Sequence, residues 1–174
     1  MVARRQPVIN RPIEDAVDLI DHLIPLLKKQ FSNEVTDVYF GDLGTYLPSH
    51  FMGPRKDQRA VLALSPGIDA PEEDSRTAAA TYRLITIDII GLVNITSEFE
   101  ASPKEGFGER RLALLMRKIR TFLEQQRNVT LDGRVQYLHV GAIRWTWTQR
   151  DKMALRGAAL EVTARVRVSR QKTQ

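Results

Sequence analysis

Apolar and polar residues alternate without interruption in the last part of the chain. From residue 158 to residue 168 every even position is apolar, and the odd positions include Glu161, Arg165 and Arg167. A period of two is typical of a strand with one buried face and one face in water. The pattern predicts a long strand over 154–170 that carries arginine on its wet face.

Two other segments have the period of an amphipathic helix. Residues 109–126 carry apolar side chains at spacings of three and four, at Leu112, Leu115, Met116, Ile119, Phe122 and Leu123. Residues 12–31 do the same at Ile13, Val17, Ile20, Ile24, Leu27 and Phe31. Pro25 removes the hydrogen bond to the carbonyl of Asp21, so we expect a kink or a break in this helix.

Four further segments indicate strands: 34–40, 59–64, 81–96 and 135–150. A turn at 65–67 is expected to end the second of them and to lead into a mobile acidic turn at 69–75. The 81–96 segment is apolar on both faces at its centre. This predicts that both faces are covered, one of them by a helix.

The predicted order of elements is therefore α-β-β-β-α-β-β. This order favours a single α+β domain over 1–174, in which two helices pack on an antiparallel sheet of strands of mixed length. Two long connections, 41–58 and 97–108, interrupt the regular elements. Connections of this length in a compact domain usually serve a partner or a function.

The composition is that of a globular chain without thiol chemistry. Hydrophobic residues make up 43% of the 174 residues, which is enough for a core. The absence of cysteine excludes disulfides, cysteine nucleophiles and thiolate metal ligands. We expect no signal peptide, because the N-terminal residues are followed by Asn10-Arg11-Pro12 and not by an apolar run. We expect no membrane partner, because no apolar run approaches the roughly 20 residues that span a bilayer. The expected location is the cytoplasm, or a particle assembled there.

Charge is divided unevenly along the chain. The net charge is +5, but residues 1–106 carry 11 basic and 16 acidic residues, whereas residues 107–174 carry 15 basic and 5 acidic ones. Three interpretations are open: a basic surface for nucleic acid, unlike faces that meet between subunits, or charges that mix and are solvated once the chain folds.

No motif for catalysis or for a cofactor is present in the sequence. It lacks a phosphate-binding Gly-Lys-Ser/Thr loop, a dinucleotide-binding GxGxxG, a GxSxG nucleophile elbow and a zinc-binding HExxH. His22, His50 and His139 lie far apart, on a predicted helix, loop and strand, so we expect no metal site. The expectation is a non-enzymatic protein that uses no cofactor.

Trp145 and Trp147 are two residues apart on a predicted strand. Their indoles therefore lie on one side of it, about 7 Å apart, and the same alternation places His139 on that side. They face either the core or a subunit interface, or they stack on single-stranded bases with Arg144 and Arg156 nearby.

Arg165 and Arg167 project from one face of the predicted last strand. Like charges this close repel each other, so the two arginines need acidic neighbours or a phosphate-rich partner. Cross-strand pairing with a carboxylate and contact with a partner are both open.

The layout and the closing strand have a counterpart in a known family. The layout has an N-terminal helix, short strands with a long apolar-tipped loop, a long strand, an acidic connection, a helix and a closing hairpin. The closing strand follows an Arg-Gly-x-x-Leu-x-hydrophobic pattern, as Arg156-Gly157-Ala158-Ala159-Leu160-Glu161-Val162. In these respects the chain resembles the tail terminator, or tail completion, proteins of long-tailed bacteriophages.

The resemblance implies a small α+β virion protein that forms a homo-oligomeric, hexameric ring on the tail tube. Such a ring contacts the tail-tube protein at the head-proximal end of the tube and ends its polymerisation. It also offers a docking surface to the head-completion or neck protein. DNA is expected to pass through the lumen without sequence readout.

Three groups of residues are candidate contacts of such a ring. The lumen or the subunit interface is expected to include Arg165, Arg167 and Glu161. The tip of the first long loop is expected to dock on a neighbouring ring, through Tyr46, Phe51 and Met52. The second long loop is expected to contribute the acidic contacts Glu98, Glu100 and Glu105.

Two alternative functions stay open at this point. One is another neck or head–tail connector protein, which shares the same logic of assembly. The other is a nucleic-acid-binding module that uses the C-terminal arginines together with Trp145 and Trp147.

Overall fold

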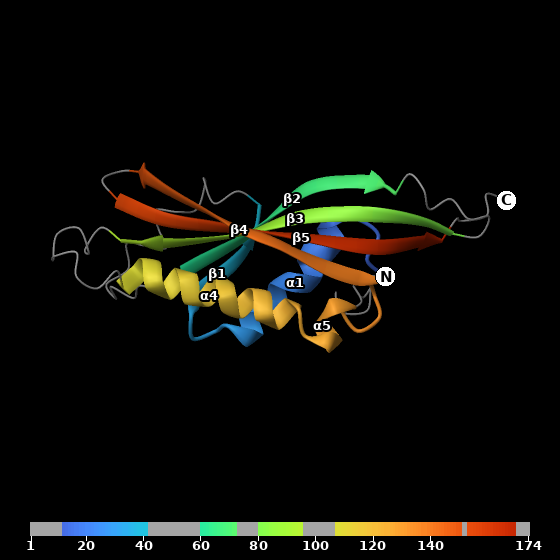
Figure 1. Cartoon of the computed structure of the whole chain (residues 1–174), viewed down its shortest axis with the longest axis horizontal. Helices are drawn as coiled ribbons and strands as arrows, with labels where there is room; N and C mark the ends of the chain where they lie inside the picture. Colours follow the sequence, from blue (N-terminus) through green and yellow to red (C-terminus); the bar gives the residue numbers. More distant parts are fainter. Residues whose placement is uncertain (1–11, 42–59, 73–79, 96–106, 151–152, 170–174) are drawn as a thin grey trace, which may run out of the picture.

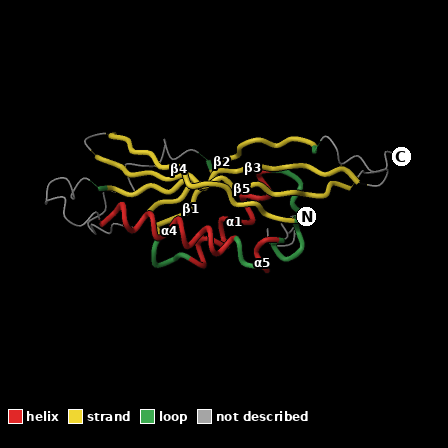
Figure 2. The backbone as a smooth tube through the Cα atoms, in the orientation of Figure 1, coloured by secondary structure: helices red, strands yellow, loops and turns green. Residues whose placement is uncertain are grey.

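The computed structural model of the chain describes residues 12–41, 60–72, 80–95, 107–150 and 153–169. These residues form one five-stranded sheet that is long and twisted (Figure 2). The described helices all lie on one face of this sheet, and none of them covers the other face (Figure 1). We call the uncovered side the helix-free face.

The elements follow the predicted order. The first half contains α1 (Ala16–Gln30), β1 (Val35–Phe40), β2 (Ala60–Pro71) and β3 (Ala80–Asn94). The second half contains α4 (Phe107–Leu123), the short α5 (Gln126–Val129), β4 (Tyr137–Arg150) and β5 (Met153–Ser169). The α+β class and the order α-β-β-β-α-β-β are confirmed. The predicted second helix ends three residues early, and α5 begins at its expected last residue.

The sheet is mixed in strand direction. Its strand order is β1-β2-β3-β5-β4, and three of the four neighbouring pairs are antiparallel. The pair of β1 and β2 is parallel, which the expected antiparallel sheet did not include. A parallel pair needs a connection of a dozen or more residues, and the stretch from 42 to 59 between the two strands is long enough.

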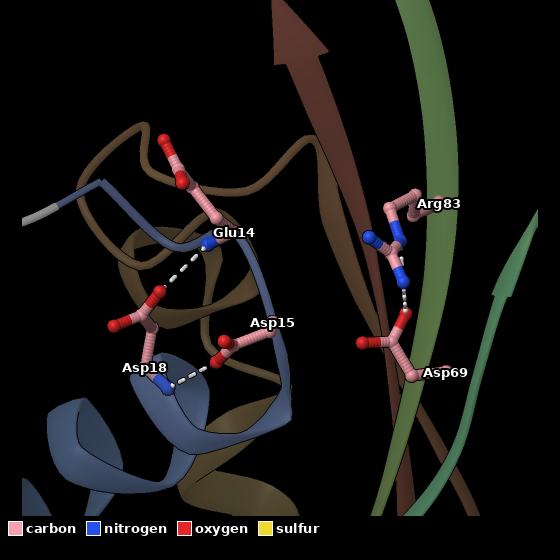
Figure 3. Close-up of polar contacts among 5 residues, drawn as sticks. All are labelled: Glu14, Asp15, Asp18, Asp69 and Arg83. Carbon is pink, nitrogen blue, oxygen red and sulfur yellow. Dashed lines mark hydrogen bonds and ion pairs between the residues drawn. The ribbon is translucent and has the colours of Figure 1, made fainter.

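Helix α1 begins later than the apolar pattern predicts, because Asp15 caps it. The Asp15 carboxylate accepts a hydrogen bond from the Asp18 N–H at 2.9 Å, and the Asp18 carboxylate accepts one from the Glu14 N–H at 3.2 Å (Figure 3). This arrangement satisfies amide groups that the first turn leaves unpaired. The helix is continuous through Pro25, so the expected break does not occur.

The buried stripe of α1 also differs from the prediction. Its buried side chains are Ala16, Leu19, Ile20, Leu23 and Leu27. Val17, which the predicted stripe included, is 48% exposed. The reason is that this helix has apolar residues on adjoining faces, and only packing against the sheet decides which of them is buried.

The core lies between the sheet and the pair α1 and α4. Its centre is made of fully buried aliphatic side chains of β3, β5 and α4, and Phe31 meets Phe122 edge to face at 5.6 Å. Helix α4 lies so close to β3 that a Cβ at Gly91 would be 2.8 Å from Cδ1 of Leu112. The apolar periods of β5 and of α4 are confirmed as the positions that form this core.

Strand β2 continues beyond the turn that was expected to end it. The pairing with β3 shifts between Pro66 and Asp69 and then resumes as far as Pro71. Asp69 is held by Arg83, whose Nη2 lies 2.8 Å from its Oδ1 (Figure 3). Residues 69–71 therefore belong to β2, and the prediction of a mobile acidic turn is wrong for them. A bulge accommodates Pro66 and Gly67, and the strand continues beyond it.

Candidate functional site

The helix-free face carries a network of charges centred on β5. The Nε and Nη2 atoms of Arg165 both donate to Oε2 of Glu72, at 2.8 and 2.7 Å, and Nη1 donates to Oε1 of Gln136 at 2.8 Å. The guanidinium also lies 4.1 Å from the ring centroid of Tyr82. The bond to Glu72 raises the pKa of Arg165, which keeps it charged.

The other two candidate residues of β5 lie on the same face. Arg167 is exposed and faces Tyr82 across the β3–β5 pair. Glu161 lies 3.9 Å from Nη2 of Arg144, and the same guanidinium donates to Asp88 at 3.1 Å. Two interpretations of Arg165 and Arg167 were open, pairing with a carboxylate and contact with a partner. Arg165 is paired with a carboxylate within the subunit.

The acidic and basic halves of the sequence meet inside the subunit. Three ion pairs join them: Glu34 with Lys118 at 2.8 Å, Glu72 with Arg165 at 2.7 Å, and Asp88 with Arg144 at 3.1 Å. Mixing of charges on folding, one of the three interpretations of the charge pattern, therefore accounts for these residues. Glu72 and Asp88 were not candidates, because nothing in a sequence indicates a partner so many residues away.

The far end of the helix-free face is apolar. Val61, Ala63, Leu92 and Leu155 form a second buried cluster there, and the half-buried Tyr39 and Ile90 pack against it. Along β3, the expected burial of both faces holds for Leu92, while Leu84 and Ile90 are half-buried. This end of the face is therefore packed within the subunit, and the centre of β3 is less completely covered.

The polar edge of β1 lies beside this cluster. Lys28 on α1 lies 2.6 Å from the Asp37 carboxylate, which also accepts a hydrogen bond from the Val38 N–H. Burial acts to raise the pKa of Asp37, but the bonds from Lys28 and Val38 outweigh it and the pKa is lowered. Burial and the charge of Asp37 raise the pKa of Tyr39 to about 12.

Trp145 and Trp147 are exposed rather than in the core. Their side chains are 41% and 69% exposed, and the guanidinium of Arg156 lies 5.6 Å from the ring of Trp145. They pair across the strands with Ala158 and Arg156, so they lie on the helix side of the sheet, at its edge. The interpretation of the two indoles as core residues is wrong.

A bulge in β4 separates these indoles from His139. The pairing with β5 shifts between Val140 and Ile143, which places two residues of β4 opposite one residue of β5. Odd-numbered residues before the bulge therefore lie on the opposite face of the sheet from odd-numbered residues after it. His139 lies opposite Thr163 on the helix-free face, so the expectation that it shares a side with the indoles is wrong.

The outer surface of the helix layer carries a shallow groove and much of the basic charge. The groove has a volume of about 460 Å³ between α1 and α4, with Phe31, Leu114 and Phe122 among its lining residues. Arg117 and Lys118 also line it, and Lys118 is paired with Glu34. The groove is open to solvent.

The described residues hold no group of three or more side chains suited to a metal ion. His22 is half-buried on α1, and burial, together with the charge of Arg134, lowers its pKa from 6.5. His139 is exposed, and His50 lies outside the described residues. A search of the described helices finds none that is both long and apolar enough to cross a membrane.

Two groups of predicted contacts cannot be placed. The loop residues Tyr46, Phe51 and Met52, and the acidic residues Glu98, Glu100 and Glu105, all lie outside the described residues. In the comparison with known proteins, no family model and no curated protein matches this sequence.

Proposed function

We propose that this chain is a tail terminator of a bacteriophage. It assembles as a ring on the end of the tail tube, stops tube growth and offers a docking surface to the head-completion or neck protein. Its work is to hold other proteins in place, and it catalyses no reaction. The proposal combines the resemblance of layout and closing strand with the character of the helix-free face.

The observation that carries the proposal is the pairing of charge on the helix-free face. Arg165 is neutralised by Glu72, and Arg144 by Asp88, while Tyr82 and Leu84 beside Arg165 are half-buried. An ion that enters a protein interface without its partner leaves an uncompensated buried charge, which is strongly unfavourable. Cations that bring their own carboxylates, as Arg144 and Arg165 do, suit contact with another protein.

The same pairing weighs against a phosphate-binding role for this face. Nucleic acids are bound by cations that replace counterions on the phosphates, and a guanidinium already held by a carboxylate contributes little. Arg165 gives both Nε and Nη2 to Glu72. The assembly interpretation therefore explains the position of Arg165 better than the nucleic-acid interpretation does.

The first test is the mass of the purified protein by light scattering over a wide range of concentration, with negative-stain images of the same samples. We expect closed rings, or stacks of rings, with a central hole. Added to tail tubes, the rings should be found on one end only, which separates a terminator from another connector protein. A monomer at every concentration would contradict the proposal.

A nucleic-acid-binding module is the second candidate, and one observation favours it. Trp145 and Trp147 are exposed on one side of a strand beside Arg156, as in surfaces on which single-stranded bases stack. Binding of a fluorescent single-stranded oligonucleotide at increasing salt tests this candidate. Tight binding that weakens steeply with salt, and that Trp145→Ala with Trp147→Ala abolishes, would favour it over the ring.

A further inference from the structure

The end of β4 carries an aromatic surface that the described part of the subunit leaves exposed. Trp145 and Trp147 are 41% and 69% exposed, and Arg156 stacks on the first of them. The Nε of Arg156 is buried and has no hydrogen-bond acceptor among the described residues, while its Nη2 reaches Glu109 at 3.0 Å. We call Trp145, Trp147 and Arg156 the tryptophan patch.

The composition of this patch is that of a protein interface. Tryptophan and arginine are the residues most enriched among those that dominate binding energy, and large exposed indoles are uncommon elsewhere. The patch also lies on an edge strand, and no described strand pairs with the outer side of β4. Glu109 of the first turn of α4 reaches Arg156, and the exposed Arg110 and Arg111 follow it in the sequence.

A surface of the opposite chemistry lies on the first turns of α1. Val17 is 48% exposed there, and carboxylates surround it at Glu14, Asp15, Asp18 and Asp21. None of the four forms an ion pair with a cation of the described ranges, and the close-up shows Asp15 and Asp18 bonded to backbone amides (Figure 3). We call these five residues the acidic patch.

The two patches lie at opposite ends of the sheet. The tryptophan patch is at the end of β4 and the start of β5, which share one end of the long strands (Figure 1). His22, which directly follows Asp21 of the acidic patch, lies near enough to Arg134 and Asp132, just before β4, for their charges to act on its pKa. The length of β4 from residue 137 to residue 147, roughly 30 Å of strand, therefore separates the patches.

We infer that the tryptophan patch of one copy docks on the acidic patch of a second copy of this chain. The indoles face the exposed Val17, and the carboxylates of the acidic patch face the guanidinium of Arg156, for which Glu109 at Nη2 is the one carboxylate partner within the described residues. This inference rests on the proposed ring. Because the two surfaces are different and lie at opposite ends, each copy can bind one neighbour at either end. This is the head-to-tail type of contact, which forms a ring when the rotation between neighbours closes.

The test is a complementation experiment by sedimentation velocity. One variant carries Trp145→Ala and Trp147→Ala, and the other carries Glu14→Lys and Asp21→Lys, which leaves the capping carboxylates Asp15 and Asp18 in place. Each variant alone should associate about 30-fold more weakly than the wild type, or worse, as expected for the loss of a binding hot spot. An equimolar mixture should form dimers of one copy of each, since each variant keeps the patch that the other lacks.

Leu114→Ala is the matched control, because Leu114 on α4 is also an exposed apolar residue, at 49%. It should associate as the wild type does, and circular dichroism should show all variants folded. Wild-type rings that both patch variants still form would overturn the inference and leave the proposed ring intact. A mixture that does not recover dimers would overturn it too, and a wild type that never associates would overturn both proposals.

Discussion

Replacement of Gly157 by alanine tests how closely the three long strands pack on the helix-free face. Gly157 pairs directly with Leu92 on β3 and with Thr146 on β4. A Cβ at residue 157 would lie 2.8 Å from Cδ2 of Leu92 and 2.9 Å from Cγ2 of Thr146. Carbon atoms prefer a separation of about 3.5–4.0 Å, so both neighbours would have to move.

The size of the effect follows from two opposing contributions. Over-packing a well-filled site costs about 1–3 kcal/mol, and alanine recovers about 0.5–1 kcal/mol because it restricts the unfolded backbone more than glycine does. The difference between these ranges is about 0–2.5 kcal/mol. Because both contacts would be shorter than 3.0 Å, we expect Gly157→Ala to lower the free energy of unfolding by about 1–2 kcal/mol, or the melting temperature by about 2–8 °C in a chain of this size.

Urea unfolding of four proteins would measure this: the wild type, Gly157→Ala, Thr146→Ser and the double variant. Serine removes the Thr146 methyl group, so the double variant should regain part of the stability that Gly157→Ala loses. Gly133→Ala is the control, because its φ of +82° makes alanine unfavourable while no atom lies within 4 Å of the added Cβ. If Gly157→Ala is as stable as the wild type, or if Thr146→Ser restores Gly133→Ala equally well, the steric argument is wrong.

Three further predictions concern titration and charge. Burial lowers the pKa of His22 from 6.5, so the fold disfavours its protonation and the wild type should lose stability as the pH falls below 6.5. Urea unfolding over a pH series should show a smaller loss for His22→Gln, and an unchanged slope would contradict this. The bond from Lys28 holds the pKa of Asp37 below 3.8 against the effect of burial, so the carboxylate stabilises the fold above pH 3.8 and this contribution disappears as the pH falls through the folded pKa. Asp37→Asn should therefore be less stable at neutral pH, by about 0.2–1 kcal/mol, and match the wild type in acid. Glu72→Gln removes the carboxylate that holds Arg165, so this variant should elute from heparin at higher salt, and elution at the wild-type position would count against a masked cation.

The regular periods of the sequence predict the elements that build the core. The even positions of β5 from 158 to 166, such as Leu160 and Val162, are fully buried, as are Leu112 and Ile119 of α4. A period is repeated over many residues, so one irregular position does not obscure it. The element order and the fold class follow from these periods alone.

Single-residue irregularities are what the sequence does not reveal. One extra residue near Gly141 reverses the parity of β4, and this alone moves His139 to the face opposite Trp145. The bulge after Pro66 extends β2 through a segment that has the composition of a turn. In both places, pairing with a neighbouring strand outweighs the local preference of the residues.

The candidate surfaces, too, could be predicted only in part from the sequence. Exposure of the indoles and the pairing of Arg165 with Glu72 depend on which strands become neighbours, and periodicity carries no information about that. Neighbouring strands are set by the whole topology, in which the last described strand lies between β3 and β4. Sequence patterns indicated the residues, and only the fold assigned their partners.

The place of β5 in the strand order also bears on how the protein folds. Ala80 pairs with Ser169 and Asn94 with Leu155, so the central pair joins residues far apart in the sequence. Contacts of this kind must close long loops before they stabilise anything, which makes folding slow. β5 is synthesised after every other described strand, and until it inserts between β3 and β4 both of these strands have an unpaired edge. A nascent or truncated chain without β5 would therefore expose unpaired backbone N–H and C=O groups on β3 and β4. We expect such a chain to aggregate or to be degraded rather than to enter an assembly.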